Sequence, residues 1–67
     1  MEVGTRVRVA EDTDLEGVID EVLENDPIGF DCVIKLTPKA MDHLQQFLPD
    51  VVQDKYRYKF EELEEIE

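Results

Sequence analysis

Cysteine and tryptophan are nearly absent from this chain: Cys32 is its one cysteine, and there is no tryptophan. A single cysteine cannot close a disulfide within the chain, and it excludes metal sites built from pairs of cysteines. A lone cysteine with apolar neighbours is typical of a small core residue in a reducing compartment. We therefore expect a cytoplasmic protein with no cofactor and no metal centre.

Positive charge is also scarce, since seven Lys and Arg stand against eighteen Asp and Glu, for a net charge of −11. Such a chain repels phosphates, which argues against direct binding to duplex nucleic acid and to anionic membrane surfaces. No apolar run approaches the roughly 20 residues that span a bilayer, and no segment has the pattern of a signal peptide. We expect no membrane insertion.

The length of the chain predicts one small domain, residues 1–67. A domain of this size lies near the lower limit at which a hydrophobic core offsets the loss of chain entropy. It leaves little room for an enclosed active site, and no set of catalytic residues converges in the sequence. We therefore predict a protein that is not an enzyme, and that is monomeric by itself or only weakly oligomeric.

Two-residue alternation of apolar side chains predicts β-strands along most of the chain. Ile19 and Val22 can share a face of their strand only through a β-bulge. Glu11–Asp14 and Asn25–Gly29 are rich in turn-forming residues and are predicted to connect strands. The strands themselves are expected at Val3–Val9, Gly17–Leu23, Phe30–Leu36, Lys55–Phe60 and Leu63–Ile66.

A helix of about three turns is predicted at about 38–48, where the period of the apolar residues changes. Thr37 suits the N-cap, Pro38 suits the first helical position, and Pro49 ends the helix. The apolar stripe of this helix is expected to cover one end of the core, and its members are Met41, Leu44, Phe47 and Leu48. If the stripe is partly exposed, Met41 and Phe47 become anchors for a partner.

Together these elements predict a mainly β fold with four to five antiparallel strands and one inserted α-helix. The last strand is expected to follow a single helical turn at Glu61–Leu63 and to pair with the first, which sets its carboxylates near Arg6 and Arg8. Short strands with a turn before the last one resemble the SH3-like small barrels. A closed barrel is therefore the expected architecture.

The segments VGTRVRV, LEGVIDEV and YRYKFEELEEI resemble a narrower group of families within that class. These are the variable chain of ferredoxin–thioredoxin reductase, the ferredoxin-binding subunit of the photosynthetic NDH-1 complex, and the small subunit associated with cytochrome b6f. The resemblance implies an accessory subunit of a photosynthetic electron-transfer complex, held at the periphery of a thylakoid-type membrane.

The concentration of acids predicts the surface that binds a partner. Nine acids and no Lys or Arg lie between Glu11 and Asp31, so we expect a basic protein, or a part of a larger complex, to bind there. The residues of this predicted acidic face are Glu11, Asp12, Asp14, Glu16, Asp20, Glu21, Glu24 and Asp26. Secondary contacts are predicted from Lys55, Arg57 and Lys59, and from Met41 and Phe47.

The other motifs in the chain favour a structural role over a catalytic or metal-binding one. Asp12–Asp20 has several oxygens at the spacing of a calcium loop but lacks the final bidentate acid, so a solvated turn with at most weak divalent binding is expected. Cys32, His43 and Asp42 could be combined as nucleophile, base and orienting acid, but an apolar strand face suppresses thiol reactivity. Asp20 and Glu21 would matter only if a pocket held them beside those residues.

A second function class stays open from the sequence. The segment Lys55–Lys59 alternates cations with tyrosines, as in some nucleic-acid-binding strips, although the alternation sends rings and cations to opposite faces. The alternative is therefore a KOW- or Tudor-like module associated with nucleic acid. In that class the chain could also bind a nucleic-acid-binding protein as an acidic mimic of phosphate.

Overall fold

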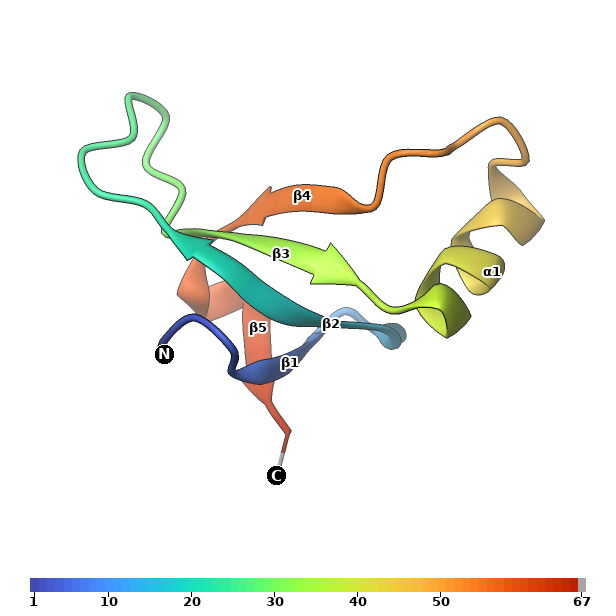
Figure 1. Cartoon of the computed structure of the whole chain (residues 1–67), viewed down its shortest axis with the longest axis horizontal. Coiled ribbons are helices and arrows are strands. Elements are labelled where there is room, and N and C mark those ends of the chain that lie inside the picture. The colour runs from blue at the N-terminus through green and yellow to red at the C-terminus, as the bar shows by residue number, and fades with distance from the viewer. Residues whose placement is uncertain (67) are drawn as a thin grey trace.

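The computed structural model describes residues 1–66 as a single antiparallel sheet with one helix at its end (Figure 1). Residue 67, the last residue of the expected domain, lies outside the described residues. The strand order across the sheet is β4-β3-β2-β1-β5. Along the chain the elements are β1 (Arg6–Val9), β2 (Asp12–Val22), β3 (Cys32–Leu36), α1 (Pro38–Phe47), β4 (Lys55–Tyr58), the 3-10 helix η1 (Phe60–Glu62) and β5 (Leu63–Glu65).

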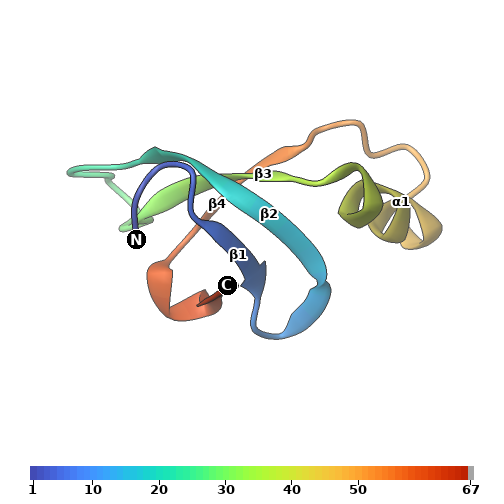
Figure 2. The ribbon, with the colours of Figure 1, turned by 60° about the horizontal axis from the view of Figure 1, so that its bottom comes forward.

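The predicted mainly β fold with five antiparallel strands and one inserted helix is confirmed. The expected closure into a barrel is not present in residues 1–66, because β4 and β5 form opposite edges of the sheet. The turn η1 joins these two strands without pairing them, as the turned view shows (Figure 2). The N–H of Phe60 is satisfied by the carboxylate of Asp31, at 2.8 Å, instead of by a strand.

The core is built mainly from alternate residues of the strands. Val7, Ile19 and Ile34 are completely buried, as is Cys32, the small core residue that the sequence predicts. Burial of such side chains contributes roughly 1.5–3 kcal/mol each to folding. The rest of the buried set consists of Val9, Leu36, Ala40 and Leu63.

Strand β2 is longer than its sequence pattern predicts. Asp12–Asp14 belongs to the strand, so the turn predicted at Glu11–Asp14 is wrong and shortens to Ala10 and Glu11. The predicted bulge is confirmed, because the register against β3 shifts between Ile19 and Glu21. A bulge bends its strand and increases the local twist, which helps β2 to follow the curvature of the sheet.

Strand β1 begins three residues later than predicted. Gly4 adopts a φ of +92°, which L side chains rarely reach, and the chain turns there. Val3 lies before this turn and is 63% exposed, so its expected place on the apolar face of the strand is wrong. The predicted pairing of the last strand with the first is confirmed, and the Arg8 guanidinium lies 3.5 Å from the Glu64 carboxylate.

Helix α1 begins and ends where the sequence predicts. The Thr37 hydroxyl accepts a hydrogen bond from the N–H of Ala40 at 3.1 Å, and Pro38 occupies the first turn. The apolar stripe is divided along its length, because Met41 and Leu44 pack against the core whereas its last two residues do not. Phe47 and Leu48 are 70% and 53% exposed.

The loop from β2 to β3 is organised by the carboxylate of Asp26. This carboxylate accepts backbone hydrogen bonds from Ile28, Gly29 and Phe30 at 3.0–3.1 Å, and its side chain is 8% exposed. The bond from Phe30, then those from Ile28 and Gly29 and the nearby Arg57 guanidinium, hold the pKa of Asp26 below its ordinary value of 3.8. The ionised form is therefore the one that the folded loop stabilises.

Replacing Asp26 by alanine is expected to lower the melting temperature by several degrees at neutral pH. Because the folded pKa is depressed, this stabilisation is present above pH about 4 and is lost as pH falls through the lower folded pKa. Thermal melts of both proteins from pH 7 to pH 2.5 should therefore converge in acid. Asp26→Asn, which keeps one acceptor oxygen, should lose less than Asp26→Ala, and equal losses at pH 7 would contradict this role of the hydrogen bonds.

Candidate functional site

The most exposed apolar surface near the helix lies where α1 ends. Phe47, Leu48 and Val52 are 70%, 53% and 86% exposed, and together with Val51 we call them the helix-end patch. A shallow hollow of about 270 Å³ is lined by Phe47, Leu48 and Val51, with Pro49 and Asp50. Clustered apolar exposure of this kind marks interaction sites more often than scattered single residues do.

The backbone around the helix-end patch is fixed by hydrogen bonds. The N–H of Leu48 donates to the carbonyl of Leu44, and the N–H of Val51 donates to the carbonyl of Leu48 at 3.1 Å. The Gln45 side-chain amide donates to the carbonyl of Val51 at 2.9 Å, which ties the returning segment to the helix. The patch is therefore preorganised, and a partner would meet little ordering cost there.

The charge around the helix-end patch has one sign. From Met41 to Asp54 the sequence has no Lys or Arg, whereas Asp42, Asp50 and Asp54 are acids. The last turn of α1 has no basic residue, so the partial negative charge of the helix C-terminus is not offset locally. The negative charge around the helix-end patch favours a partner that brings positive charge beside an apolar side chain.

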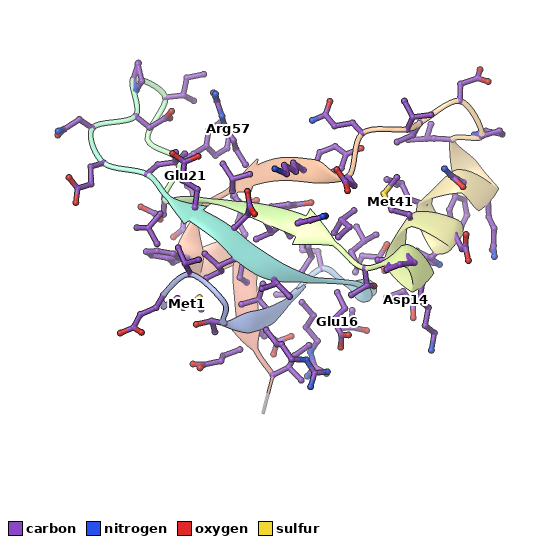
Figure 3. All side chains as sticks on the ribbon, in the orientation of Figure 1. Met1, Asp14, Glu16, Glu21, Met41 and Arg57 are labelled. Carbon is purple, nitrogen blue, oxygen red and sulfur yellow. The ribbon has the colours of Figure 1, made fainter. Side chains whose placement is uncertain are left out.

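The predicted acidic face is spread along β2 and its flanking turns, and much of it is paired. Figure 3 shows Asp14 next to α1 and Glu21 toward the other end of the sheet, near Arg57. In the described part of the chain no ion pair is formed by Glu11, Glu21 or Glu24. The pairs are Glu16 with Arg6, Asp20 with Lys55, Asp26 with Arg57, and both Asp12 and Asp14 with His43.

Two of the cations predicted as secondary contacts, Lys55 and Arg57, lie beside acids while their side chains stay 53% and 59% exposed. The Lys55 ammonium lies 3.3 Å from Asp20, and the Arg57 guanidinium lies 3.9 Å from Asp26. Tyr56 and Tyr58 pack against the core, as the alternation predicts. A stacking platform for nucleic acid requires rings and cations on the same surface, and in this strand they lie on opposite faces.

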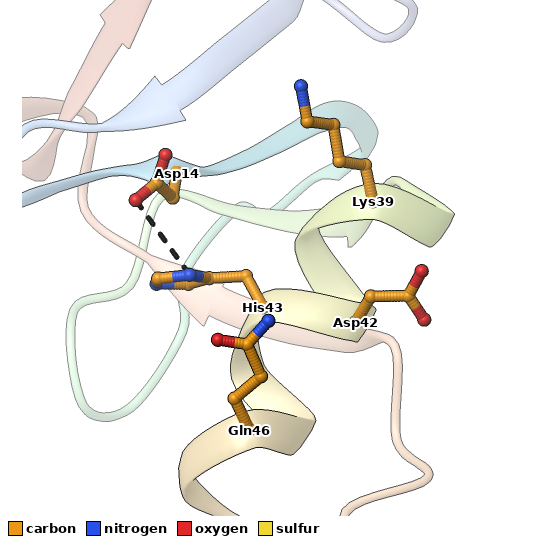
Figure 4. Close-up of a pocket in the computed structure, with 5 residues that line it drawn as sticks. All are labelled: Asp14, Lys39, Asp42, His43 and Gln46. Atoms are coloured by element: carbon orange, nitrogen blue, oxygen red, sulfur yellow. Dashed lines mark ion pairs between the residues drawn. The ribbon is translucent and has the colours of Figure 1, made fainter.

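The residues that could have formed a catalytic group are not brought together. Cys32 is completely buried, its thiol lies 3.6 Å from the carbonyl of Tyr58, and burial with the nearby Asp31 carboxylate raises its pKa. The Asp42 side chain points away from the His43 ring (Figure 4). A buried thiol with a raised pKa is a poor nucleophile, so this set has no arrangement for covalent catalysis.

His43 instead lies against two acids of β2, a grouping that the sequence analysis missed. Its Nε2 is 3.3 Å from Asp12 Oδ2, and its Nδ1 is 3.7 Å from Asp14 Oδ2. One local signal existed, because Asp12 and Asp14 are two residues apart and therefore share a face of any strand. Their distance from His43 along the chain, 31 residues for Asp12, left the third member without a local signal.

Comparisons with protein-family models, with curated proteins and with solved structures found no match for this chain. Among residues 1–66, no helix combines the length and the apolar character needed to cross a membrane.

Proposed function

We propose that this chain is a non-enzymatic protein-interaction module, an accessory subunit that docks on a basic region of a larger protein through the helix-end patch. The observation that carries this proposal is the exposure of Phe47 at 70% and of Val52 at 86% within Met41–Asp54, a stretch of sequence that has no Lys or Arg. The preferred partner segment has an apolar anchor side chain flanked by Lys or Arg. The anchor fills the hollow beside Phe47, and the cations face Asp50 and the helix C-terminus.

The acids outside the patch have a different part in this proposal. Glu11, Glu21 and Glu24 are exposed, and with the net charge of −11 they attract a basic partner over a longer range. Such steering changes the association rate and its salt dependence more than the final affinity. The resemblance of the chain ends suggests a photosynthetic electron-transfer complex as the assembly, with this chain at the periphery of a thylakoid-type membrane, and it is proposed on that basis alone.

The test is capture of partners from a native lysate by the immobilised chain, with identification by mass spectrometry and measurement of the binding constant of each basic protein found. Val52→Asp and Phe47→Ala are expected to weaken the specific partner on the order of tenfold or more, since apolar anchors dominate such interfaces. Because both side chains are exposed, neither change should alter the melting temperature by more than a few degrees.

A matched control is Ile28→Asp, since Ile28 is 69% exposed but lies in the loop between β2 and β3, away from α1 (Figure 1). This variant should bind the partner as the unchanged protein does. Equal binding by Val52→Asp, Phe47→Ala and the unchanged chain would refute the helix-end patch as the docking surface. Equal losses in Ile28→Asp and Val52→Asp would refute it as well, because the effect would then be one of charge alone.

A further inference from the structure

We propose that Asp12, Asp14 and His43 form a binding site for a divalent transition-metal ion, with Zn²⁺ as the best fit. None of the three proposed ligands belongs to the helix-end patch, and the inference does not require the proposed docking function. One ligand atom from each of the three side chains can be chosen so that all lie within 4.8 Å of one another. Ligand atoms placed 2.0–2.1 Å from zinc in a tetrahedron are ~3.4 Å apart, so small side-chain rotations suffice.

The ring of His43 is held in place from two sides. Asp12 presents its Oδ2 to Nε2 at 3.3 Å, while its Oδ1 accepts the N–H of Asp14 at 3.2 Å. The edge-on ring of Phe47 lies with its centroid 5.4 Å from that of His43. The Asp14 N–H on Asp12 and the Phe47 ring on His43 are outer contacts, and ligands fixed by such contacts bind metals more tightly because less ordering is left for the binding step.

The two carboxylates reach the helix because of an irregularity in β2. Val9 of β1 pairs with Asp12, but the preceding Arg8 pairs with Glu16, so three residues of β2 have no partner in β1. These residues can therefore leave the regular surface of the hairpin, and Asp14 is among them. The Asp12 and Asp14 carboxylates both reach His43 of α1, at 3.3 Å and 3.7 Å.

The site is open to an ion from solvent. A pocket of about 250 Å³ is lined by Asp14, Lys39, Asp42, His43 and Gln46, and the Asp14 side chain is 72% exposed. Figure 4 shows the Asp14 carboxylate facing the His43 ring, whereas the Lys39 amino group points away from it. Asp14 is thus free to turn toward Nε2, the nitrogen that Asp12 faces, and the remaining coordination positions are left to water.

The donor set selects the class of ion. One imidazole nitrogen and two carboxylate oxygens suit Zn²⁺ and its neighbours in the first transition row. Ca²⁺ and Mg²⁺ prefer sites made of oxygen alone, and soft ions prefer thiolates, of which the buried Cys32 offers none here. The net charge of −11 raises the local concentration of any cation near this surface.

The experiment is a titration of the purified chain with ZnCl₂. Binding is measured by calorimetry and by the proton NMR signals of the imidazole. The chain has one histidine, so its two ring C–H signals report on this site without further assignment. We expect these signals to shift until one Zn²⁺ is bound per chain, and we expect CaCl₂ to leave them in place. His43→Gln and Asp14→Asn should each weaken this binding on the order of tenfold or more.

Asp42→Asn is the matched control, since it removes a carboxylate from the same pocket but not from the three proposed ligands. Its zinc affinity should stay within about twofold of the unchanged protein, allowing only for the lost charge. Circular dichroism checks that each variant is folded, and the exposed Asp14 provides a test if His43→Gln is not. Unmoved imidazole signals at saturating zinc, or equal affinity in His43→Gln, would overturn the proposal.

Discussion

Ile34→Ala is expected to destabilise the protein by about 2–5 kcal/mol, enough to leave much of it unfolded at 25 °C. Ile34 is completely buried on β3, where it pairs with Ile19 of β2 and Tyr56 of β4. Truncation loses the favourable free energy of transferring the deleted atoms out of water, and it leaves a cavity between the neighbouring strands. Urea unfolding followed by circular dichroism measures the loss as a shift of the midpoint.

Two further variants separate the cavity from a general effect of substitution. Ile34→Val removes one methylene group and should cost about 0.5–1.5 kcal/mol. Val52→Ala changes a side chain that is 86% exposed and should be within about 0.5 kcal/mol of neutral. An unfolding midpoint for Ile34→Ala equal to that of Val52→Ala would show that the core is not where the structure places it.

Gly17→Ala is expected to destabilise the protein by about 2–3 kcal/mol, because the strand leaves no room for a methyl group. A Cβ at Gly17 would lie 2.5 Å from the carbonyl oxygen of Lys35 and 3.3 Å from the Cα of Leu36. Both obstacles are backbone atoms of β3, so neither can rotate away. The strands would have to separate, and urea unfolding should show a correspondingly lower midpoint.

The controls for Gly17→Ala distinguish a steric clash from other effects of adding a side chain. Gly29→Ala adds a methyl group with nothing within 4 Å, but at a φ of +95°, so it should cost only the conformational strain of about 1–2 kcal/mol. Val18→Ala changes the next residue of the same strand, which is 36% exposed, and should cost less than about 1 kcal/mol. A Gly17→Ala protein as stable as Val18→Ala would contradict the close approach of β3.

The elements that the sequence predicts correctly are those specified by neighbouring residues. Thr37, Pro38 and Pro49 set the ends of α1 because an N-cap oxygen and a ring without an N–H act within one turn. The bulge in β2 is likewise a local conflict, since Ile19 and Glu21 lie on either side of one extra residue. Strand ends are less well predicted. Alternation continues through Val3 into a turn without a local stop signal, whereas Asp12–Asp14 is rich in turn-forming residues but belongs to β2.

The candidate sites were predicted only in part. Phe47 was expected as a partner anchor if the helix stripe proved to be exposed, and its 70% exposure meets that condition, whereas Met41 packs against the core. Sequence periodicity places both on one helix face but says nothing of how far the sheet extends beneath that face. The first turns of α1 therefore pack against the core, whereas its last turn extends past the core.

The sequence by itself determined a small, acidic, mainly β domain with one capped helix, because net charge is a sum over the residues and because alternation and capping depend only on near neighbours. Only the tertiary structure decided that the sheet stays open, that His43 meets Asp12 and Asp14, and that Asp20 pairs with Lys55. These features depend on strand register and on the packing of a helix against a distant strand. A one-residue change of register moves every side chain of a strand to the other face, and no local pattern specifies which distant groups then meet.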